Sequence, residues 1–361
     1  MNKEALIVIP GLDATEVGYA LDRTVEKICS QQSIATVNEI SSPENPNMKS
    51  IEVTYEATGE KKRIDIYEVY WGDIIEKNYS DDVTIFKKFF FGLELIFFWI
   101  FSPIWKAAYK NKWMFIGIVF SGLLVTFWFI SVIGILISAL DSAEVLDTIK
   151  YVFHDPPLEE EIRMGLSFKE APKLVSDFFT KLFVVVGVVL SLFPGVIALI
   201  LKVSGFSMKF IKSQIIRDGV KKRLAAMANA IGRDNSYSSI TFFAHSLGVI
   251  PLIHFISDYE NYGNKNIRCI TVGSPVSFLM NKTPLFKEYI VNSLKNIHVT
   301  AWYDFFSKED WLCSYDSVKK YGDRFDSEEI SMDTSWTSRL STKPHKAYFN
   351  HSKVIKKLIA D

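Results

Sequence analysis

The chain has 361 residues and a formal net charge of zero, with 41 basic and 41 acidic side chains. This balance gives no electrostatic reason to expect a nucleic-acid partner. Hydrophobic residues make up 48% of the sequence, including 28 phenylalanines, which is rich for a water-soluble protein. The excess is concentrated in the middle of the chain.

The three cysteines, Cys29, Cys269 and Cys313, have no metal-like spacing. Cys269 and Cys313 sit in or beside apolar runs, where a cysteine is usually a plain core residue. An odd number of scattered cysteines favours a reducing compartment.

The N-terminal part of the chain predicts short strands and one helix. Residues 5–10, "ALIVIP", form an apolar strand-like run, and residues 14–32 have helical periodicity. Residues 50–71 are typical of two strands around a turn that contains Gly59.

Two stretches in the middle of the chain, 113–140 and 182–201, contain no charged residue. A helix needs about 20 apolar residues to cross a bilayer, and both stretches are long enough. A buried core helix of this length normally carries a polar stripe, which neither stretch has. We therefore predict a transmembrane hairpin whose two helices are joined by the acidic loop 141–181.

A third apolar stretch, 89–105, is shorter, carries Glu94 and is rich in Phe and Trp. These features favour an interfacial or re-entrant helix, although a third span stays open. Because the two ends of the chain read as halves of one domain, they must lie on one side of the membrane. The number of crossings should therefore be even.

Lysines flank the hairpin on the side of the chain ends, whereas the loop 141–181 is acidic. Cytoplasmic segments carry the excess of Lys and Arg. We therefore expect an integral protein of the bacterial inner membrane with both chain ends in the cytoplasm. The flanking lysines are Lys106, Lys110, Lys112, Lys202, Lys209 and Lys212.

Beyond the predicted hairpin, strands and helices alternate. The expected strands are 240–244, 267–273 and 297–303, and the expected helices are 206–232, 247–258, 284–294 and 347–360. Such alternation predicts an α/β fold with a mostly parallel central sheet. The expected organisation is one α/β domain formed by 1–84 and 205–361, interrupted by the membrane insertion 85–204.

Ser246 lies in Ala-His-Ser-Leu-Gly, between the strand 240–244 and the helix 247–258. Small residues two positions before and after a serine suit a nucleophile elbow, a sharp strand-to-helix turn that exposes the hydroxyl. The pattern alone is weak, and a structural bend is the alternative reading. The strand before it and the helix after it favour a nucleophilic serine.

A nucleophilic serine needs a base, and the chain has only six histidines. Four are disfavoured because they are expected across the membrane, beside the serine but pointing away, along the following helix, or inside a strand: His154, His245, His254 and His298. His345 follows Pro344 in a loop-like segment, and loops often carry catalytic groups. It is preferred over His351, which falls on the last predicted helix.

The acid that orients the base should lie between Ser246 and His345 in the sequence. Three candidates, Asp304, Asp310 and Asp316, lie at or after the strand 297–303. Asp304 is at the strand end itself. Asp310 is followed by apolar residues that could bury it, and such an acid is usually sheltered.

An oxyanion hole needs two backbone N–H groups. Leu247, directly after the serine at the start of the next helix, is one candidate donor. The turn "PGLD" near the N-terminus offers the other, the N–H of Leu12, because Gly11 permits a close backbone approach.

These segments together resemble the α/β-hydrolase family, in particular lipases and serine esterases. The matching stretches are "VIPGLD" (8–13), "YEVYWGD" (67–73), "FFAHSLG" (242–248), "ITVGSPV" (270–276), "WYDFFSKEDWL" (302–312) and "PHKAYF" (344–349). The resemblance covers roughly 1–80 and 205–361. The region 85–204 departs from it, where a soluble lid or cap would stand.

The resemblance implies an α/β-hydrolase fold and favours Asp310 as the acid, with Asp304 as the alternative. It also implies that no metal or organic cofactor is used. The expected function is a membrane-anchored serine hydrolase with a cytoplasmic catalytic domain that cleaves lipid acyl esters. Alternatives are an acyl-thioesterase or acyltransferase, a membrane-active defence or toxin effector, and a non-catalytic scaffold. Homo-oligomerisation is compatible with each.

Overall fold

A computed structural model describes residues 2–11, 16–30, 35–40, 48–77, 205–260, 263–313, 324–339 and 343–359, with isolated positions between 94 and 126. The chain divides into two compact units. The first comprises Met1–Val83, Ser102–Ile118 and Val203–Asp361, and the second Thr84–Phe101 and Val119–Lys202. All elements named below belong to the first unit.

The predicted membrane segments 113–140 and 182–201, the loop 141–181 and the stretch 89–105 lie outside the described residues, apart from the isolated positions. Within the part of the chain that the structure describes, no helix combines the length and apolar character needed to cross a membrane.

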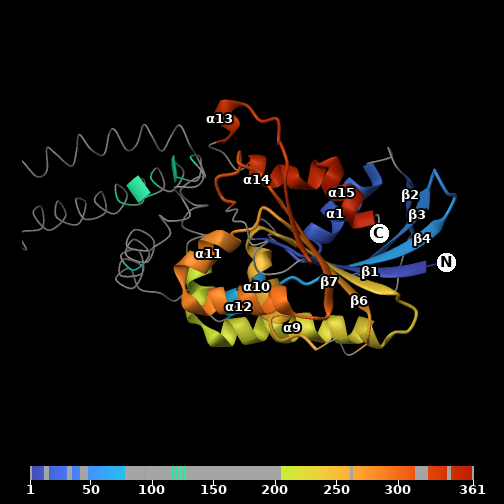
Figure 1. The fold of residues 1–361 in the computed structure, drawn as a ribbon, viewed down its shortest axis with the longest axis horizontal. Coiled ribbons are helices and arrows are strands. Elements are labelled where there is room, and N and C mark those ends of the chain that lie inside the picture. Colours follow the sequence, from blue (N-terminus) through green and yellow to red (C-terminus); the bar gives the residue numbers. More distant parts are fainter. Residues whose placement is uncertain are drawn as a thin grey trace, which may run out of the picture. The chain divides into compact units, whose positions relative to one another are not determined.

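An eight-stranded sheet forms the centre of the first unit, with the strand order β2-β3-β4-β1-β5-β6-β7-β8 (Figure 1). The strands are β1 (Asn2–Ile9), β2 (Ala35–Ile40), β3 (Met48–Tyr55), β4 (Lys61–Glu68), β5 (Ser239–His245), β6 (Asn266–Val272), β7 (Val299–Phe306) and β8 (Phe325–Glu329). Five of the seven neighbouring pairs are parallel, and only the pairs that involve β3 are antiparallel. The predicted α/β class with a mostly parallel sheet is therefore confirmed.

The central strands β1 and β5 are nearly continuous apolar runs. Every residue of β5 is buried, and so is β1 from Glu4 to Ile9. A parallel strand covered by helices on both faces needs such a run, because neither face meets water. β1 pairs with β4 on one side and with β5 on the other.

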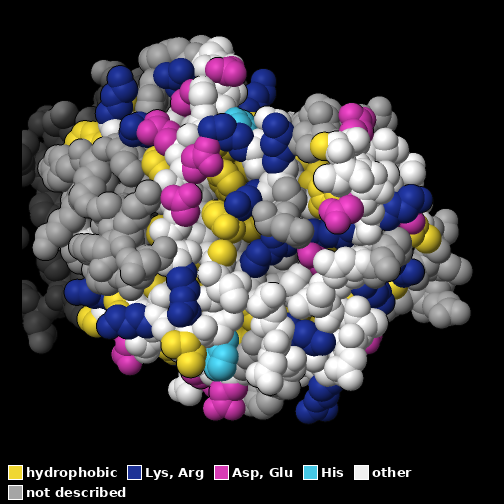
Figure 2. Space-filling view, turned by 45° about the vertical axis from the view of Figure 1, so that its right-hand side comes forward, with side chains coloured by type: hydrophobic (Ala, Val, Ile, Leu, Met, Phe, Trp, Pro, Cys, Tyr) yellow, Lys and Arg dark blue, Asp and Glu magenta, His cyan; other side chains and the backbone are white. Residues whose placement is uncertain are grey.

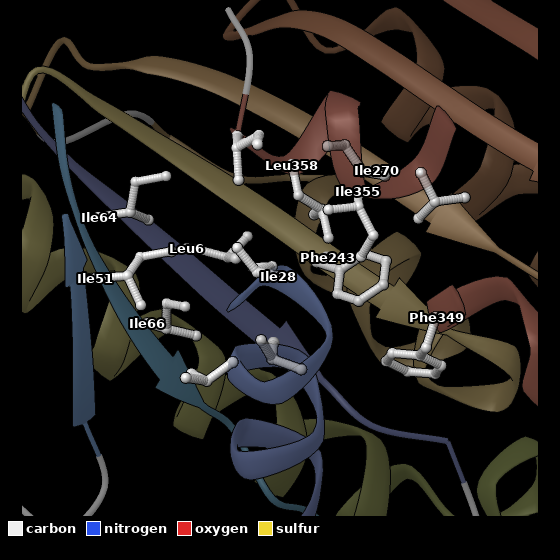
Figure 3. Packing of buried hydrophobic residues seen from close by; sticks show 14 of the residues in the cluster. Leu6, Ile28, Ile51, Ile64, Ile66, Phe243, Ile270, Phe349, Ile355 and Leu358 are labelled. Atoms are coloured by element: carbon white, nitrogen blue, oxygen red, sulfur yellow. The ribbon is translucent and has the colours of Figure 1, made fainter. Parts of the chain in front are cut away.

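Helices cover both faces of the sheet. α1 (Tyr19–Ser30) and α15 (Ser352–Ile359) lie on one face, and α9 (Gln214–Arg233), α10 (Val249–Ile256) and α12 (Pro284–Lys295) on the other (Figure 1). Between the sheet and the first pair, Leu6, Phe243 and Ile270 of the strands meet Ile28 and Ile355 of the helices (Figure 3). The surface is mixed in charge, because basic and acidic side chains are interspersed on the face shown in Figure 2.

Two edge strands and several short helices, among them α2 (Gly72–Lys77) and α13 (Trp336–Arg339), were not expected from the sequence. β2 alternates only over its first four residues, where Ala35 and Val37 are buried, and β8, "FDSEE", has one buried side chain, so the apolar signal of both strands is weak. The helix α11 (Val276–Lys282) directly precedes α12, and the two are separated only by Thr283. β2 and β8 form through tertiary packing, which short polar segments do not reveal.

The predicted single helix 206–232 is wrong in one respect, because Ser213 divides it. Residues 205–212 are helical, and α9 starts anew at Gln214. The Ser213 side chain accepts a hydrogen bond from the N–H of Ile216, as an N-cap does. The buried guanidinium of Arg217 donates to the carbonyls of Phe210 and Ile211, which are unsatisfied at the end of the first helix.

Two other predicted helices, 14–32 and 347–360, are shorter in the structure. Gly18 has a φ of +91°, which a right-handed helix cannot contain, so α1 begins only at Tyr19. The predicted helix 347–360 is broken by a 3-10 turn (Tyr348–Asn350) before α15. His351 therefore precedes the last helix instead of lying on it, and its Nδ1 accepts from the N–H of Lys353 at 3.3 Å.

Candidate active site

Ser246 occupies a strained turn between β5 and α10. Its φ is +55°, a backbone conformation that residues other than glycine adopt infrequently. A 3-10 turn (Ser246–Gly248) joins the strand directly to the helix. Strained backbone of this kind concentrates at functional sites, and a nucleophile elbow requires it. The serine is only partly buried, so its hydroxyl can reach a substrate.

The two small residues around Ser246 have different surroundings. Ala244 is fully buried within β5. A Cβ on Gly248 would lie 2.4 Å from the carbonyl oxygen of Ile9 and 2.6 Å from that of Pro10. Gly248 is therefore required by the close approach of the backbone at the end of β1, and its φ of −62° is an ordinary helical value.

Gly248→Ala should lower both stability and activity. The added methyl cannot fit without moving the elbow or the end of β1, and overpacking of this kind costs about 1–3 kcal/mol. Thermal unfolding and labelling of Ser246 by a fluorophosphonate measure the two effects. Gly232→Ala is the matched control, because the nearest atom to a Cβ there is 3.7 Å away. Equal behaviour of the two variants would contradict the prediction.

His345 lies between Ser246 and Asp310. Its Nε2 is 2.6 Å from Oγ of Ser246, and its Nδ1 is 2.7 Å from Oδ2 of Asp310. A carboxylate can only accept, so Nδ1 carries the proton and Nε2 accepts the hydrogen bond of the serine hydroxyl. The structure thus brings together the three predicted side chains. The loop prediction for His345 is wrong, because it lies in the short helix α14 (Lys343–Ala347).

Asp310 is held in the loop after β7 and is 1% exposed. Its Oδ1 accepts from the N–H of Leu312 at 3.0 Å, which leaves Oδ2 for His345. The loop is fixed from the other side by Tyr348, whose hydroxyl accepts from the N–H of Ser307 at 3.0 Å. The carboxylate is therefore sheltered and oriented before any ligand binds.

The alternative acid Asp304 lies within β7 and binds another partner. The Thr271 hydroxyl donates to its Oδ1 at 2.6 Å and accepts from the indole N–H of Trp302 at 3.1 Å. Burial raises the pKa of Asp304 to about 7, because the charged form loses its hydration. The third candidate, Asp316, lies outside the described residues.

The raised pKa of Asp304 predicts a pH dependence of stability. The pKa is 3.8 in the unfolded chain and about 7 in the fold, so between these values only the folded state holds the proton. The free energy of unfolding therefore falls as pH rises through this window, by up to a few kcal/mol, and then levels off. Asp304→Asn should flatten this decline. Thermal midpoints at about pH 5 and about pH 8 measure it, and parallel wild-type and variant curves would contradict it.

Of the two candidate oxyanion donors, Leu247 belongs to the residues that the structure describes, and Leu12 lies outside them. Leu247 follows Ser246 in the 3-10 turn, where the first N–H groups of a helix have no partner within the helix. The chain on either side of Leu12 is anchored by the last residue of β4 and by the segment after β4. Trp71 donates from its indole to the carbonyl of Pro10 at 2.8 Å, and Glu68 accepts from the N–H of Gly18 at 2.6 Å.

Three further residues shape the position of His345. His245 and Tyr348 lie against its ring, with centroids 4.8 and 6.4 Å away. A Cβ on Gly273, whose φ is +60°, would lie 3.1 Å from Cε1 of His345. The sequence placed Gly273 at the end of the predicted strand 267–273, which was the one available signal. Nothing in the sequence indicated that His245 would contact the base.

His254 lies apart from the relay of hydrogen bonds formed by Asp310, His345 and Ser246. His254 is buried in α10 against the ring of Tyr289, as a core residue is expected to be, and burial lowers its pKa to about 4. Cys269 and Cys313 are buried free thiols, and Cys29 is half-buried.

Comparison of the chain with family models, with curated proteins and with solved structures gave no match.

Proposed function

We propose that the protein is a serine hydrolase of the α/β-hydrolase type that cleaves acyl esters of membrane lipids. The observation that carries the proposal is the relay from Asp310 through His345 to Ser246, with the serine on a positive-φ turn between a central strand and a helix. The order Ser, Asp, His along the chain is the order of this hydrolase class.

The proposed reaction has two balanced halves. In the first, Ser246 Oγ bonds to the ester carbonyl carbon while His345 Nε2 takes the hydroxyl proton, and Asp310 stabilises the imidazolium. The carbon–oxygen bond to the alcohol then breaks, and the alcohol leaves with that proton. In the second half, water attacks the acyl-serine with His345 again accepting the proton, and the fatty acid leaves as Ser246 regains its hydrogen. The N–H of Leu247 stabilises the oxyanion in both halves, together with that of Leu12.

A lipid substrate is supported by the positions of the two segments that flank the region 78–204 in the sequence. The short helix α2 (Gly72–Lys77) follows the carboxyl end of β4 on one side of this region, and the helical residues 205–212 follow it on the other side. There the ring of Phe206 packs on Trp71, which holds Pro10 at the carboxyl end of β1. Both flanking segments thus lie near the carboxyl ends of the central strands, where Ser246 also lies. The uncharged stretches 113–140 and 182–201 belong to the chain between them.

The full chain in detergent or reconstituted vesicles tests the proposal. Fatty acid release is measured from phosphatidylglycerol vesicles, from triacylglycerol emulsion and from long-chain acyl-coenzyme A. We expect lipid esters to be cleaved at least tenfold faster than the thioester. The reverse ratio would favour an acyl-thioesterase, and failure of a fluorophosphonate to label the folded protein would favour a non-catalytic scaffold.

A further inference from the structure

His245 links the nucleophile and the base through contacts separate from the relay itself. It is the last residue of β5, directly before Ser246, and it is 2% exposed. Its Nε2 lies 2.9 Å from the backbone carbonyl oxygen of His345. A carbonyl oxygen only accepts, so Nε2 of His245 carries a hydrogen and donates it. The bond joins residues that are 100 positions apart in the sequence.

The imidazole of His245 also packs against the base and the turn that follows it. Its ring centroid is 4.8 Å from that of His345 and 5.0 Å from that of Phe349, the latter in an edge-on arrangement. The side chain of His245 therefore holds His345 in two ways. It donates a hydrogen bond to the backbone of His345, and it packs against the ring of His345. Both contacts come from the residue whose peptide bond leads to Ser246.

The contacts form a closed ring. Oγ of Ser246 meets Nε2 of His345 at 2.6 Å, the carbonyl of His345 meets His245 at 2.9 Å, and the peptide bond from His245 returns to Ser246. Any movement of α14 away from the elbow must break the His245 bond as well as the serine–histidine bond. Misplacement of reacting groups by about 1 Å can cost 100-fold in rate.

We propose that His245 is a positioning residue that fixes the distance between Ser246 and His345 by holding the backbone of the base. The expected effect on the rate of hydrolysis rests on the proposed function. The positioning of His345 by His245 rests only on the hydrogen bond and the ring contact. Packing by itself would be met by any aromatic ring of similar size, whereas positioning requires the donor.

Two substitutions separate the donor from the ring. His245→Phe keeps an aromatic ring and removes the donor, and His245→Gln keeps an N–H donor and removes the ring. His254→Phe is the matched control, because His254 is also buried, lies on the helix that follows the elbow and packs against the ring of Tyr289. All three are compared with wild type by thermal unfolding and with a soluble short-chain aryl ester.

We expect His245→Phe to lower kcat by about 10- to 100-fold, with KM changed less than about twofold. His245→Gln should recover most of this loss, and His254→Phe should match wild type. The proposal is overturned if His245→Phe folds and keeps the wild-type kcat, or if His245→Gln and His245→Phe lose activity equally, in proportion to their loss of thermal stability.

A measurement without turnover keeps the positioning claim distinct from the proposed function. The proton on Nδ1 of His345, bonded to buried Asp310, should give a low-field resonance in the proton NMR spectrum. We expect this resonance in wild type and His245→Gln, and its loss or broadening in His245→Phe. If wild type hydrolyses no ester, the proposed function fails, while an unchanged resonance in His245→Phe would overturn the positioning role.

Discussion

Ser246→Ala is expected to reduce ester hydrolysis by about 10⁴-fold or more, to a rate that only binding and the oxyanion donors sustain. The alanine keeps the small volume that the turn needs and removes the only atom that can bond to the acyl carbon. Oγ of Ser246 is also the atom hydrogen-bonded to Nε2 of His345, so the variant leaves the base without a proton to accept. Initial rates with lipid and soluble esters measure the loss, and intact-mass analysis shows whether a fluorophosphonate still adds.

Ser239→Ala provides the matched control. Ser239 opens the same strand β5 at its opposite end, and its buried hydroxyl has no hydrogen-bond partner among the described residues. Removing an unpaired buried hydroxyl is neutral or stabilising, so this variant should keep the wild-type rate. Ser246 would be removed from the mechanism if its alanine variant retained more than about a tenth of the activity, since loss of a triad member costs far more.

Asp310→Asn is expected to lower kcat by about 10²- to 10⁴-fold, with little change in KM. An amide has nearly the same shape as the carboxylate but no charge to stabilise the imidazolium. It can also offer N–H to Nδ1 of His345, which would turn the histidine to the tautomer that cannot accept from Ser246. The side chain accepts from the N–H of Leu312, so loss of this bond must be separated from loss of chemistry.

Asp304→Asn separates the two carboxyl groups. Its amide can still accept from the Thr271 hydroxyl, and the group is away from the serine–histidine contact, so kcat at neutral pH should stay within about threefold of wild type. Steady-state kinetics of both variants, with thermal midpoints as a check on folding, decide between them. A larger loss in Asp304→Asn than in Asp310→Asn would make Asp304 the acid.

The central part of the fold could be predicted because its residues carry strong local signals. β1 ends in the apolar run Ala5–Ile9, β5 is mostly apolar and buried throughout, and Gly248 sits at the turn between strand and helix. The pairing of Ser246 with His345 could also be predicted, because the chain has only six histidines from which to choose the base. The choice between Asp304 and Asp310 from the residues alone was less secure. It depends on which way a loop after β7 packs, and local sequence does not determine loop packing.

Other features depend on tertiary context and could not be predicted. β8 has one buried residue and forms because β7 offers a free edge to pair with. The break at Ser213 arises from its cap and from a single guanidinium, that of Arg217, which satisfies the end of the preceding helix. The bond from His245 to the backbone of His345 joins distant segments, so no local pattern could reveal it.

The position of β1 between β4 and β5 has a consequence for biosynthesis. β4 follows β1 closely in the sequence, but β5 begins at Ser239, after the whole region 78–204 has been made. Until then one edge of β1, which ends in the apolar run Ala5–Ile9, has no partner, and such an edge is prone to pair with other chains. A nascent chain paused within 78–204 would expose this edge on the N-terminal half. Translation arrest in that region should therefore yield a species that chaperones retain, released only when β5 emerges and the elbow with it.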